Sequence, residues 1–103
     1  MELKKKDIFG VEVNYTEMGK LEYLLQEAKI PYRMDYVLGM PSVRYYGHND
    51  ELICDAICHS YSYGYGEGLL EIMGLTSNED FVEGWLTSEE VFDRISEDWY
   101  KGN

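Results

Sequence analysis

The sequence predicts a single α+β domain with a mainly antiparallel sheet of about five strands and two helices, near residues 16–29 and 88–100. Three observations support this fold class. Several short segments alternate in polarity between turn residues, as strands do. Two segments repeat apolar residues at helical spacing behind capping residues. The strands also follow one another between the two helices, which favours helices on one face of an antiparallel sheet.

The N-terminal part predicts one strand and the first helix. Residues 8–15 (IFGVEVNY) alternate in polarity, which is typical of a strand. Asn14 followed by Glu17 fits a capping box, and Pro31 ends the helix that follows. The apolar positions of that helix recur every three to four residues: Met18, Leu21, Leu25 and Ala28.

The middle of the chain predicts a hairpin and the central strand. Residues 32–38 and 42–46 fit two strands joined through 39–41. Residues 51–62 (ELICDAICHSYS) then predict the central strand of the sheet. Its alternate positions are small and apolar, as a strand beneath a helix requires: Leu52, Cys54, Ala56 and Cys58.

The C-terminal part predicts a further strand and the second helix. Residues 69–73 (LLEIM) fit either a strand or one helical turn, which periodicity cannot separate in so short a run. Residues 81–86 (FVEGWL) predict a short strand. Thr87 and Glu90 form a second capping box. The apolar stripe behind it is Val91, Phe92, Ile95 and Trp99.

Charge is the strongest global signal. Twenty acidic residues against nine basic ones give a net charge of −11, and no Lys or Arg occurs from Tyr45 to Asp93. The sequence therefore predicts no direct nucleic-acid binding, because phosphate binding depends on Lys and Arg. The same field attracts a basic protein surface, such as a nucleic-acid groove. The alternative explanation is the ordinary solubility of an acidic protein.

The sequence predicts a soluble cytoplasmic protein without membrane contact. No apolar run approaches the ~20 residues of a membrane span. Residues 1–9 carry a positive cluster without an apolar segment behind it, so they do not fit a secretory signal. Cys54 and Cys58 fit a reducing compartment, where buried thiols behave as small apolar side chains.

No catalytic, metal or cofactor site is predicted. Cys58 and His59 are adjacent, and adjacent strand residues point to opposite faces. On a strand, Cys54 and Cys58 would lie roughly 13 Å apart, too far to share a metal ion. Carboxylates that could act as acid or base are present, but no pattern marks a pair among them: Asp55, Glu67, Glu71 and Glu83.

The stretch CHSYSYGYGEG, residues 58–68, is the candidate binding segment. If the strand continues, its tyrosines share one face and form a stacking platform. Its glycines would let a ligand approach the backbone closely. The alternative is a strand that ends in a loose glycine turn. The predicted contact residues are His59, Tyr61, Ser62, Tyr63, Tyr65 and Glu67, with the acids Glu79, Asp80 and Glu83. These three acids are expected to be exposed.

The second half of the chain resembles a family of small uncharacterised proteins from phages and mobile elements of Gram-positive bacteria. The resemblance rests on CHSYSYG, GLLEIMG and EGWLTSEEVFDRI, within residues 58–95. It implies a viral or mobile-element origin. Small acidic phage proteins are often inhibitors of host defence, including anti-CRISPR proteins that occupy the nucleic-acid site of a nuclease. Others sequester cyclic-nucleotide signals.

Two functions are therefore expected as alternatives. The first is a non-catalytic inhibitor, in the host cytoplasm, that occupies a basic nucleic-acid-binding surface of a host defence protein such as a nuclease. The second is a small-molecule binder that sequesters a nucleotide-type signal through residues 59–68. An anionic ligand favours a nearby Arg or Lys, and only Arg33, Arg44 and Arg94 could supply one. A homo-oligomer is left open by the sequence.

Overall fold

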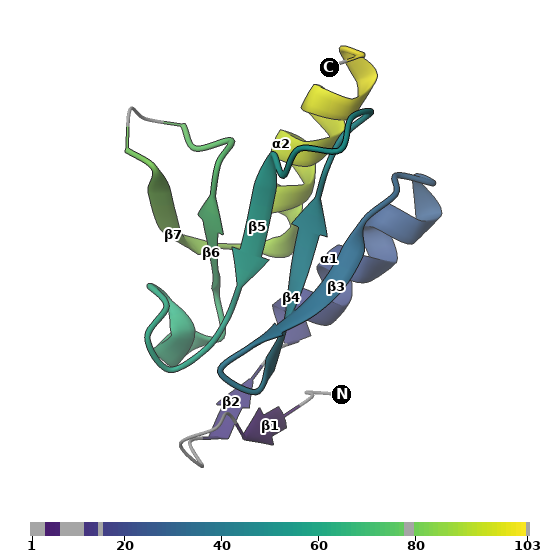
Figure 1. Ribbon diagram of the computed structural model, residues 1–103. Coiled ribbons are helices and arrows are strands. Elements are labelled where there is room, and N and C mark those ends of the chain that lie inside the picture. The colour runs from purple at the N-terminus through teal and green to yellow at the C-terminus, as the bar shows by residue number, and fades with distance from the viewer. Residues whose placement is uncertain (1–3, 7–11, 15, 78–79, 103) are drawn as a thin grey trace.

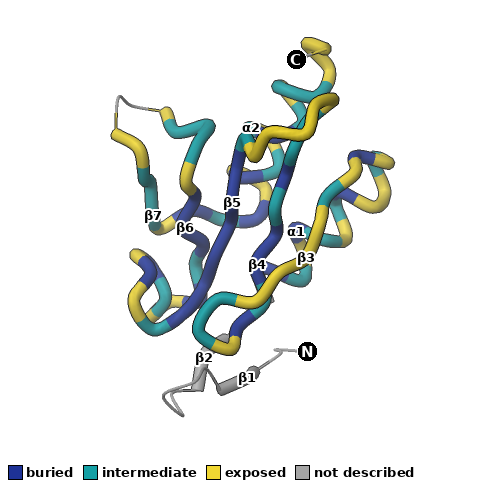
Figure 2. The backbone as a smooth tube through the Cα atoms, in the orientation of Figure 1, coloured by how far each residue is buried: buried dark blue, intermediate teal, exposed yellow. Residues whose placement is uncertain are grey.

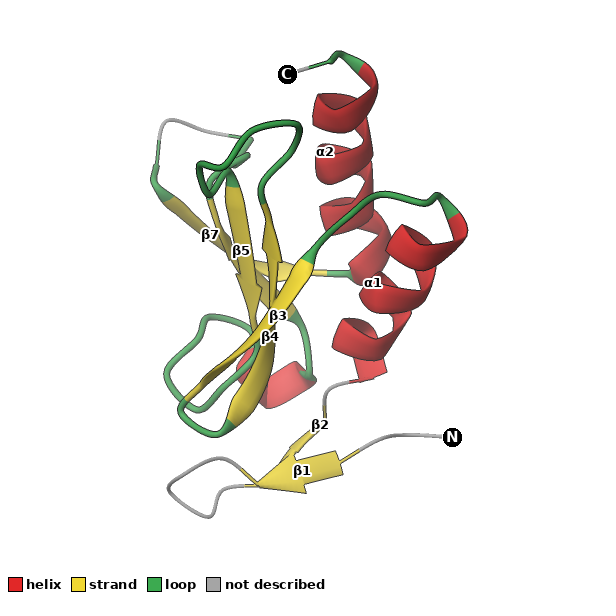
Figure 3. Cartoon of the chain, turned by 45° about the vertical axis from the view of Figure 1, so that its right-hand side comes forward, coloured by secondary structure: helices red, strands yellow, loops and turns green. Residues whose placement is uncertain are grey.

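Two helices pack side by side against one face of a five-stranded antiparallel sheet (Figures 1 and 3). The computed structural model describes residues 4–6, 12–14, 16–77 and 80–102. The helices are α1 (Thr16–Glu27) and α2 (Ser88–Tyr100). The predicted fold class, an α+β domain with both helices on one face, is confirmed.

The five strands pair in chain order. They are β3 (Arg33–Val37), β4 (Met40–Tyr45), β5 (Cys54–Ile57), β6 (Leu70–Met73) and β7 (Val82–Leu86). All four pairings are antiparallel. A separate hairpin joins β1 (Lys4–Lys6) and β2 (Glu12–Asn14). Residues 69–73, ambiguous in the sequence, therefore supply a strand.

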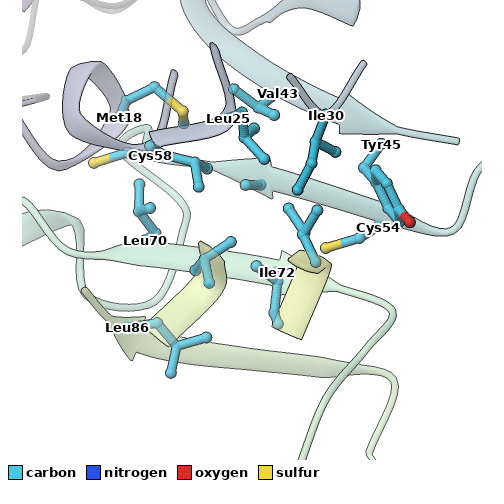
Figure 4. Close-up of a cluster of buried hydrophobic side chains, with 14 of the residues drawn as sticks. Met18, Leu25, Ile30, Val43, Tyr45, Cys54, Cys58, Leu70, Ile72 and Leu86 are labelled. Atoms are coloured by element: carbon cyan, nitrogen blue, oxygen red, sulfur yellow. The ribbon is translucent and has the colours of Figure 1, made fainter. Parts of the chain in front are cut away.

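Register assigns the two faces of the sheet. Val43, Ala56 and Ile72 lie opposite one another across β4, β5 and β6, and all three are fully or almost fully buried. Their side chains belong to the core beneath the helices, which Figure 4 shows around Val43 and Ile72. Side chains alternate along a strand, so the residues next to these three in sequence point to the other side of the sheet, here called the helix-free face. Its members on these strands are Ser42, Arg44, Asp55, Ile57, Glu71 and Met73.

The helices close the core with the residues that their spacing predicts. Met18, Leu21 and Leu25 of α1 are fully buried, as are Val91 and Ile95 of α2. The buried stretches of the backbone follow the middle strands and the inner sides of the helices (Figure 2). Both cysteines are buried and neither belongs to a disulfide, as predicted.

The predicted capping box of α2 is present. The Thr87 hydroxyl accepts a hydrogen bond from the Glu90 amide at 3.2 Å. The Glu90 carboxylate accepts one from the Thr87 amide at 3.0 Å. Two amide groups that the first turn leaves unsatisfied are thereby paired, which fixes where α2 begins.

The predicted central strand over residues 51–62 is too long. β5 covers only Cys54–Ile57, and Leu52 lies outside it with 46% of its surface exposed. The tyrosines of residues 61–65 are therefore not on a strand, and the predicted row of phenols on one face is wrong. The chain turns after β5 because the Ser62 amide and hydroxyl both bond the His59 carbonyl, at 2.9 Å and 2.8 Å.

The N-terminal predictions are confirmed only in part. Within the predicted strand 8–15, the described strand is Glu12–Asn14, and residues 8–11 and 15 lie outside the described part of the chain. The first helix ends at Glu27, two residues earlier than predicted. Lys29 then adopts a φ of 59°, and the Ile30 amide bonds the Leu25 carbonyl at 3.0 Å. Neither α1 nor α2 has the length and hydrophobicity of a bilayer-spanning helix, and the described ranges hold no other candidate.

Candidate partner-binding surfaces

The turn after β5 uses its polar groups internally. The His59 amide donates to the Ser62 hydroxyl at 2.9 Å, and the Tyr61 amide donates to His59 Nδ1 at 3.1 Å. Both His59 and Ser62 are buried, with 7% and 8% of their surfaces exposed. An acceptor role for Nδ1 requires that the neutral ring carry its proton on Nε2. These two predicted contact residues therefore shape the turn and do not face solvent.

Tyr63 leaves the turn and stacks on Trp85 of β7. The ring centroids lie 5.4 Å apart with an interplanar angle of 20°. The Tyr63 amide donates to Glu71 Oε1 at 2.9 Å, and its carbonyl accepts from the Trp85 amide at 3.3 Å. Both side chains remain more than half exposed, at 57% for Tyr63 and 56% for Trp85. Tyr63 and Trp85 are called the aromatic pair below.

Backbone geometry fixes the aromatic pair. The β6–β7 register shifts between Leu70 and Ile72, and Trp85 adopts a φ of 56° at this irregularity. Tyr63 crosses directly over Gly84, where an added Cβ would lie 2.2 Å from the Tyr63 Cβ. A glycine within a strand often marks such a bulge or close approach, so the sequence carried a signal for this feature. Trp85 itself was absent from the predicted contact residues.

The other predicted contact residues of the candidate binding segment differ in exposure and packing. Tyr61 is 72% exposed. Tyr65, in the short 3-10 helix η1 (Tyr65–Glu67), is half-buried and packs against the hydrophobic core. Glu67 is exposed at the end of the same turn. The structure therefore brings Tyr63 to Trp85 and separates it from Tyr65.

The helix-free face holds a buried charge cluster. Asp55 and Glu71 lie on adjacent strands, with 9% and 7% of their surfaces exposed. Arg44 bonds Asp35 at 3.2 Å from the neighbouring strand. Burial raises the pKa of Asp55. Arg44 and His59 oppose that rise, and Asp35 and Glu71 add to it. Sequence reasoning named both carboxylates but not their proximity, which depends on strand register.

The cysteines are poor nucleophiles in this structure. Burial raises the pKa of Cys54 to about 12, and the charge of Asp55 adds to the effect. Burial alone raises the pKa of Cys58 to about 11. Both thiols are therefore protonated at neutral pH, whereas the thiolate is the reactive form. Within the described residues, no three His, Cys, Asp or Glu side chains are grouped as metal ligands would be.

The outer side of α2 carries the largest row of exposed acids in one element. Its members, called the α2 acidic face, are Glu89, Glu90, Asp93 and Glu97. The two cations of this region are held in ion pairs. Lys101 bonds Glu97 at 2.7 Å. Arg94 bonds both oxygens of Glu83, at 2.9 Å and 3.0 Å.

The three acidic residues predicted as contacts on and before β7 differ in their surroundings. Glu83 is half-buried and committed to Arg94, so its expected exposure is wrong. Hydrogen bonds from Arg94 and then from Ser77 lower the pKa of Glu83 to about 2. Asp80 is exposed, and its carbonyl accepts from the Thr76 hydroxyl at 2.6 Å. Glu79 lies outside the described residues.

The surface hollows formed by the described residues include two that lie away from the candidate binding segment. The larger, of about 260 Å³, lies at the C-terminal end of α2 and is lined by Leu75, Thr76, Arg94, Glu97, Asp98 and Lys101. The smaller, of about 160 Å³, is lined by Pro31, Tyr32, Arg33, Tyr46, Gly47 and Asn49. Neither includes a residue of the segment 59–68, so neither supports a nucleotide pocket there.

Comparison with known proteins adds no relative. No family model matches the chain, and no curated protein or solved structure matches it.

Proposed function

We propose that this protein is a non-catalytic inhibitor that occupies a basic, nucleic-acid-binding surface of a host defence protein. The observation that carries the proposal is the α2 acidic face, whose four carboxylates outnumber the two cations of this region. Of those cations, Arg94 is paired with Glu83 and only Lys101 is paired with a member of the face, Glu97. The resemblance of residues 58–95 to phage and mobile-element proteins supplies the defence setting. A nuclease is the partner class that best fits an acidic competitor of nucleic acid.

The geometry of α2 suits such a partner. Glu89, Asp93 and Glu97 follow one another at four-residue spacing, so they lie on one side of the helix about 6 Å apart along its axis. A row of like charges destabilises a helix by a few tenths of a kcal/mol per pair. The helix dipole compensates Glu89 at the first turn but not Asp93 in the middle. A basic partner would compensate the whole row.

The protonated, buried thiols of Cys54 and Cys58 are consistent with an inhibitor that works by occupying its partner and not by a thiol reaction.

Electrostatic complementarity between the α2 acidic face and a basic partner raises the association rate. The attraction weakens as the salt concentration rises, with a Debye length of about 8 Å at physiological ionic strength.

The second candidate function, sequestration of a nucleotide-type signal, is favoured by one observation. The exposed aromatic pair could stack a base. The buried carboxylate of Glu71, which bonds the Tyr63 amide, would repel the phosphate of the same ligand. We therefore rank this function second.

The test compares two double charge reversals that change net charge equally. Asp93→Lys/Glu97→Lys alters the α2 acidic face, and Glu27→Lys/Glu51→Lys alters exposed acids elsewhere. Competition with target DNA for purified RNA-guided nucleases of Gram-positive hosts is measured at several salt concentrations. We expect the α2 variant to lose at least ~10-fold in inhibition and the control at most ~3-fold.

Circular dichroism establishes that both variants fold. Equal losses in the two would mean that net charge alone matters. Inhibition that persists in the α2 variant would refute the proposed site.

A further inference from the structure

The aromatic pair is an exposed surface of the residue types that dominate protein interfaces. Trp and Tyr are enriched among the residues that contribute most of the binding energy. Here they are stacked at 5.4 Å and each is more than half exposed, with the 72% exposed Tyr61 two residues before Tyr63. Scattered single aromatics need no explanation, but a stacked and exposed pair does.

The chain holds this pair rigid at a conformational cost. A tryptophan with positive φ costs on the order of 1–2 kcal/mol, and Trp85 has a φ of 56°. Three constraints keep it there: the Trp85 amide bonds the Tyr63 carbonyl, the Tyr63 amide bonds Glu71, and Gly84 leaves room for Tyr63. Strained positions cluster at functional sites, and rigid aromatic anchors lose little entropy on binding.

The charge around the pair selects a cation. Both rings come from a sequence range, Tyr45 to Asp93, that contains no Lys or Arg. The arginines that reach this part of the sheet from outside the range are paired with carboxylates, Arg94 with Glu83 and Arg44 with Asp35. The buried carboxylate of Glu71 lies at the Tyr63 backbone, and Glu67 is exposed in η1. Aromatic faces carry negative potential, and carboxylates nearby deepen it. An anionic group is disfavoured here, and a cation is favoured.

We infer that the Tyr63–Trp85 pair receives an arginine side chain of a basic protein partner. The inference rests on the proposed function and names the contact through which that partner is anchored. Arginine fits better than lysine because its planar guanidinium stacks on an aromatic face as well as carrying charge. Along the chain, Trp85 precedes Glu89, the first member of the α2 acidic face, by four residues.

The experiment uses a short arginine–glycine peptide and a lysine–glycine peptide of equal length and charge. The ¹H–¹⁵N spectrum resolves the indole N–H signals of Trp85 and Trp99, which Trp85→Phe assigns. Trp99 is an internal reference because it stacks on His48 at 3.7 Å. We expect the arginine peptide to shift the Trp85 signal selectively and to bind about 2- to 5-fold tighter than the lysine peptide, a smaller difference than loss of the ring causes because lysine also makes cation–π contacts.

Two substitutions remove the indole ring of Trp85. Trp85→Leu is the direct test, and Trp85→Asn protects against misfolding because asparagine tolerates positive φ. Both should lose about 3- to 30-fold in affinity for the arginine peptide. Tyr100→Leu, which removes a 70% exposed aromatic from α2, should leave it unchanged. Equal affinity for the two peptides, or binding that survives loss of the ring, would overturn the inference.

Adenosine monophosphate is the third probe. A Trp85 shift with the nucleotide and none with the arginine peptide would assign the pair to a base and overturn the inference. The two proposals also fail separately. If the Trp85 variants still bind arginine and inhibit while the α2 reversal does not, only this inference fails. If arginine binds at Trp85 but no nuclease is inhibited, only the proposed function fails.

Discussion

Glu83 and Asp55 belong to the same sheet but lie on opposite faces, and their surroundings differ accordingly. Glu83 faces the helices, where Arg94 of α2 bonds both of its oxygens and its pKa falls. Asp55 lies on the helix-free face, where its pKa rises with burial. Its Oδ1 atom has no hydrogen-bond partner within the described part of the chain, and the buried hydroxyl of Ser42 on the same face has none either.

This contrast separates two uses of polar residues. On the covered face, a second element supplies the partner that a half-buried carboxylate needs, so the pair ties β7 to α2. On the helix-free face, polar groups are buried with incomplete compensation, which costs stability. The aromatic pair belongs with the second group, because Tyr63 is held there by Glu71. The helix-free face thus combines incompletely compensated polar groups with the exposed aromatic pair.

The largest expected effect comes from separating Tyr63 from β7. Gly84→Ala would place a Cβ 2.2 Å from that of Tyr63 and 2.9 Å from its carbonyl oxygen. Backbone would have to move, so we expect a loss of about 2–4 kcal/mol in the free energy of unfolding. Urea denaturation measures it.

Gly66→Ala is the matched control, since its Cβ would meet nothing within 4 Å. Its effect should stay within about 0.5 kcal/mol. Equal stabilities of the two variants would show that residues 59–68 do not pack on β7 as described.

Local features of the molecule were predicted from the sequence, whereas contacts between distant residues were not. The second helix was predicted correctly because its capping box and apolar stripe are local signals. The turn at 59–62 was missed because it depends on Ser62 bonding back to His59, which alternation of residue types cannot reveal. Trp85 was missed because its partner, Tyr63, is distant in sequence. Asp55 stood out within an apolar strand, but its neighbour Glu71 follows only from strand register.

A smaller effect on the free energy of unfolding is expected at Glu83, the carboxylate that is paired with Arg94. Glu83→Gln removes the charge that binds Arg94, and we expect a loss of about 1–2 kcal/mol at pH 7, less than for a fully buried pair because both side chains are partly exposed. The pKa of Glu83 lies at about 2 against its ordinary 4.5, so its contribution is present above pH 4.5. That contribution is lost as the pH falls through about 2.

Urea unfolding at pH 7 and at stepwise lower pH follows this dependence. The stability difference between the wild type and Glu83→Gln should shrink as the pH falls from 4.5 towards 2. A constant difference over that range would mean that the carboxylate charge is not what stabilises the β7–α2 contact.

The smallest effect, and the opposite sign, is expected at Asp55. Its pKa is raised by burial, so ionisation opposes folding: its favourable contribution is complete below the ordinary pKa of 3.8 and is lost as the pH rises through the folded-state value. Asp55→Asn removes that ionisation while keeping the shape of the side chain.

At pH 7 this substitution should therefore leave the free energy of unfolding unchanged or raise it by up to about 1 kcal/mol, because Arg44 retains its ion pair with Asp35. Urea unfolding at pH 7 and pH 4 should show this gain diminishing in acid. A loss of more than about 2 kcal/mol at pH 7 would identify Asp55 as a stabilising partner of Arg44, and the contrast between the two faces would fail.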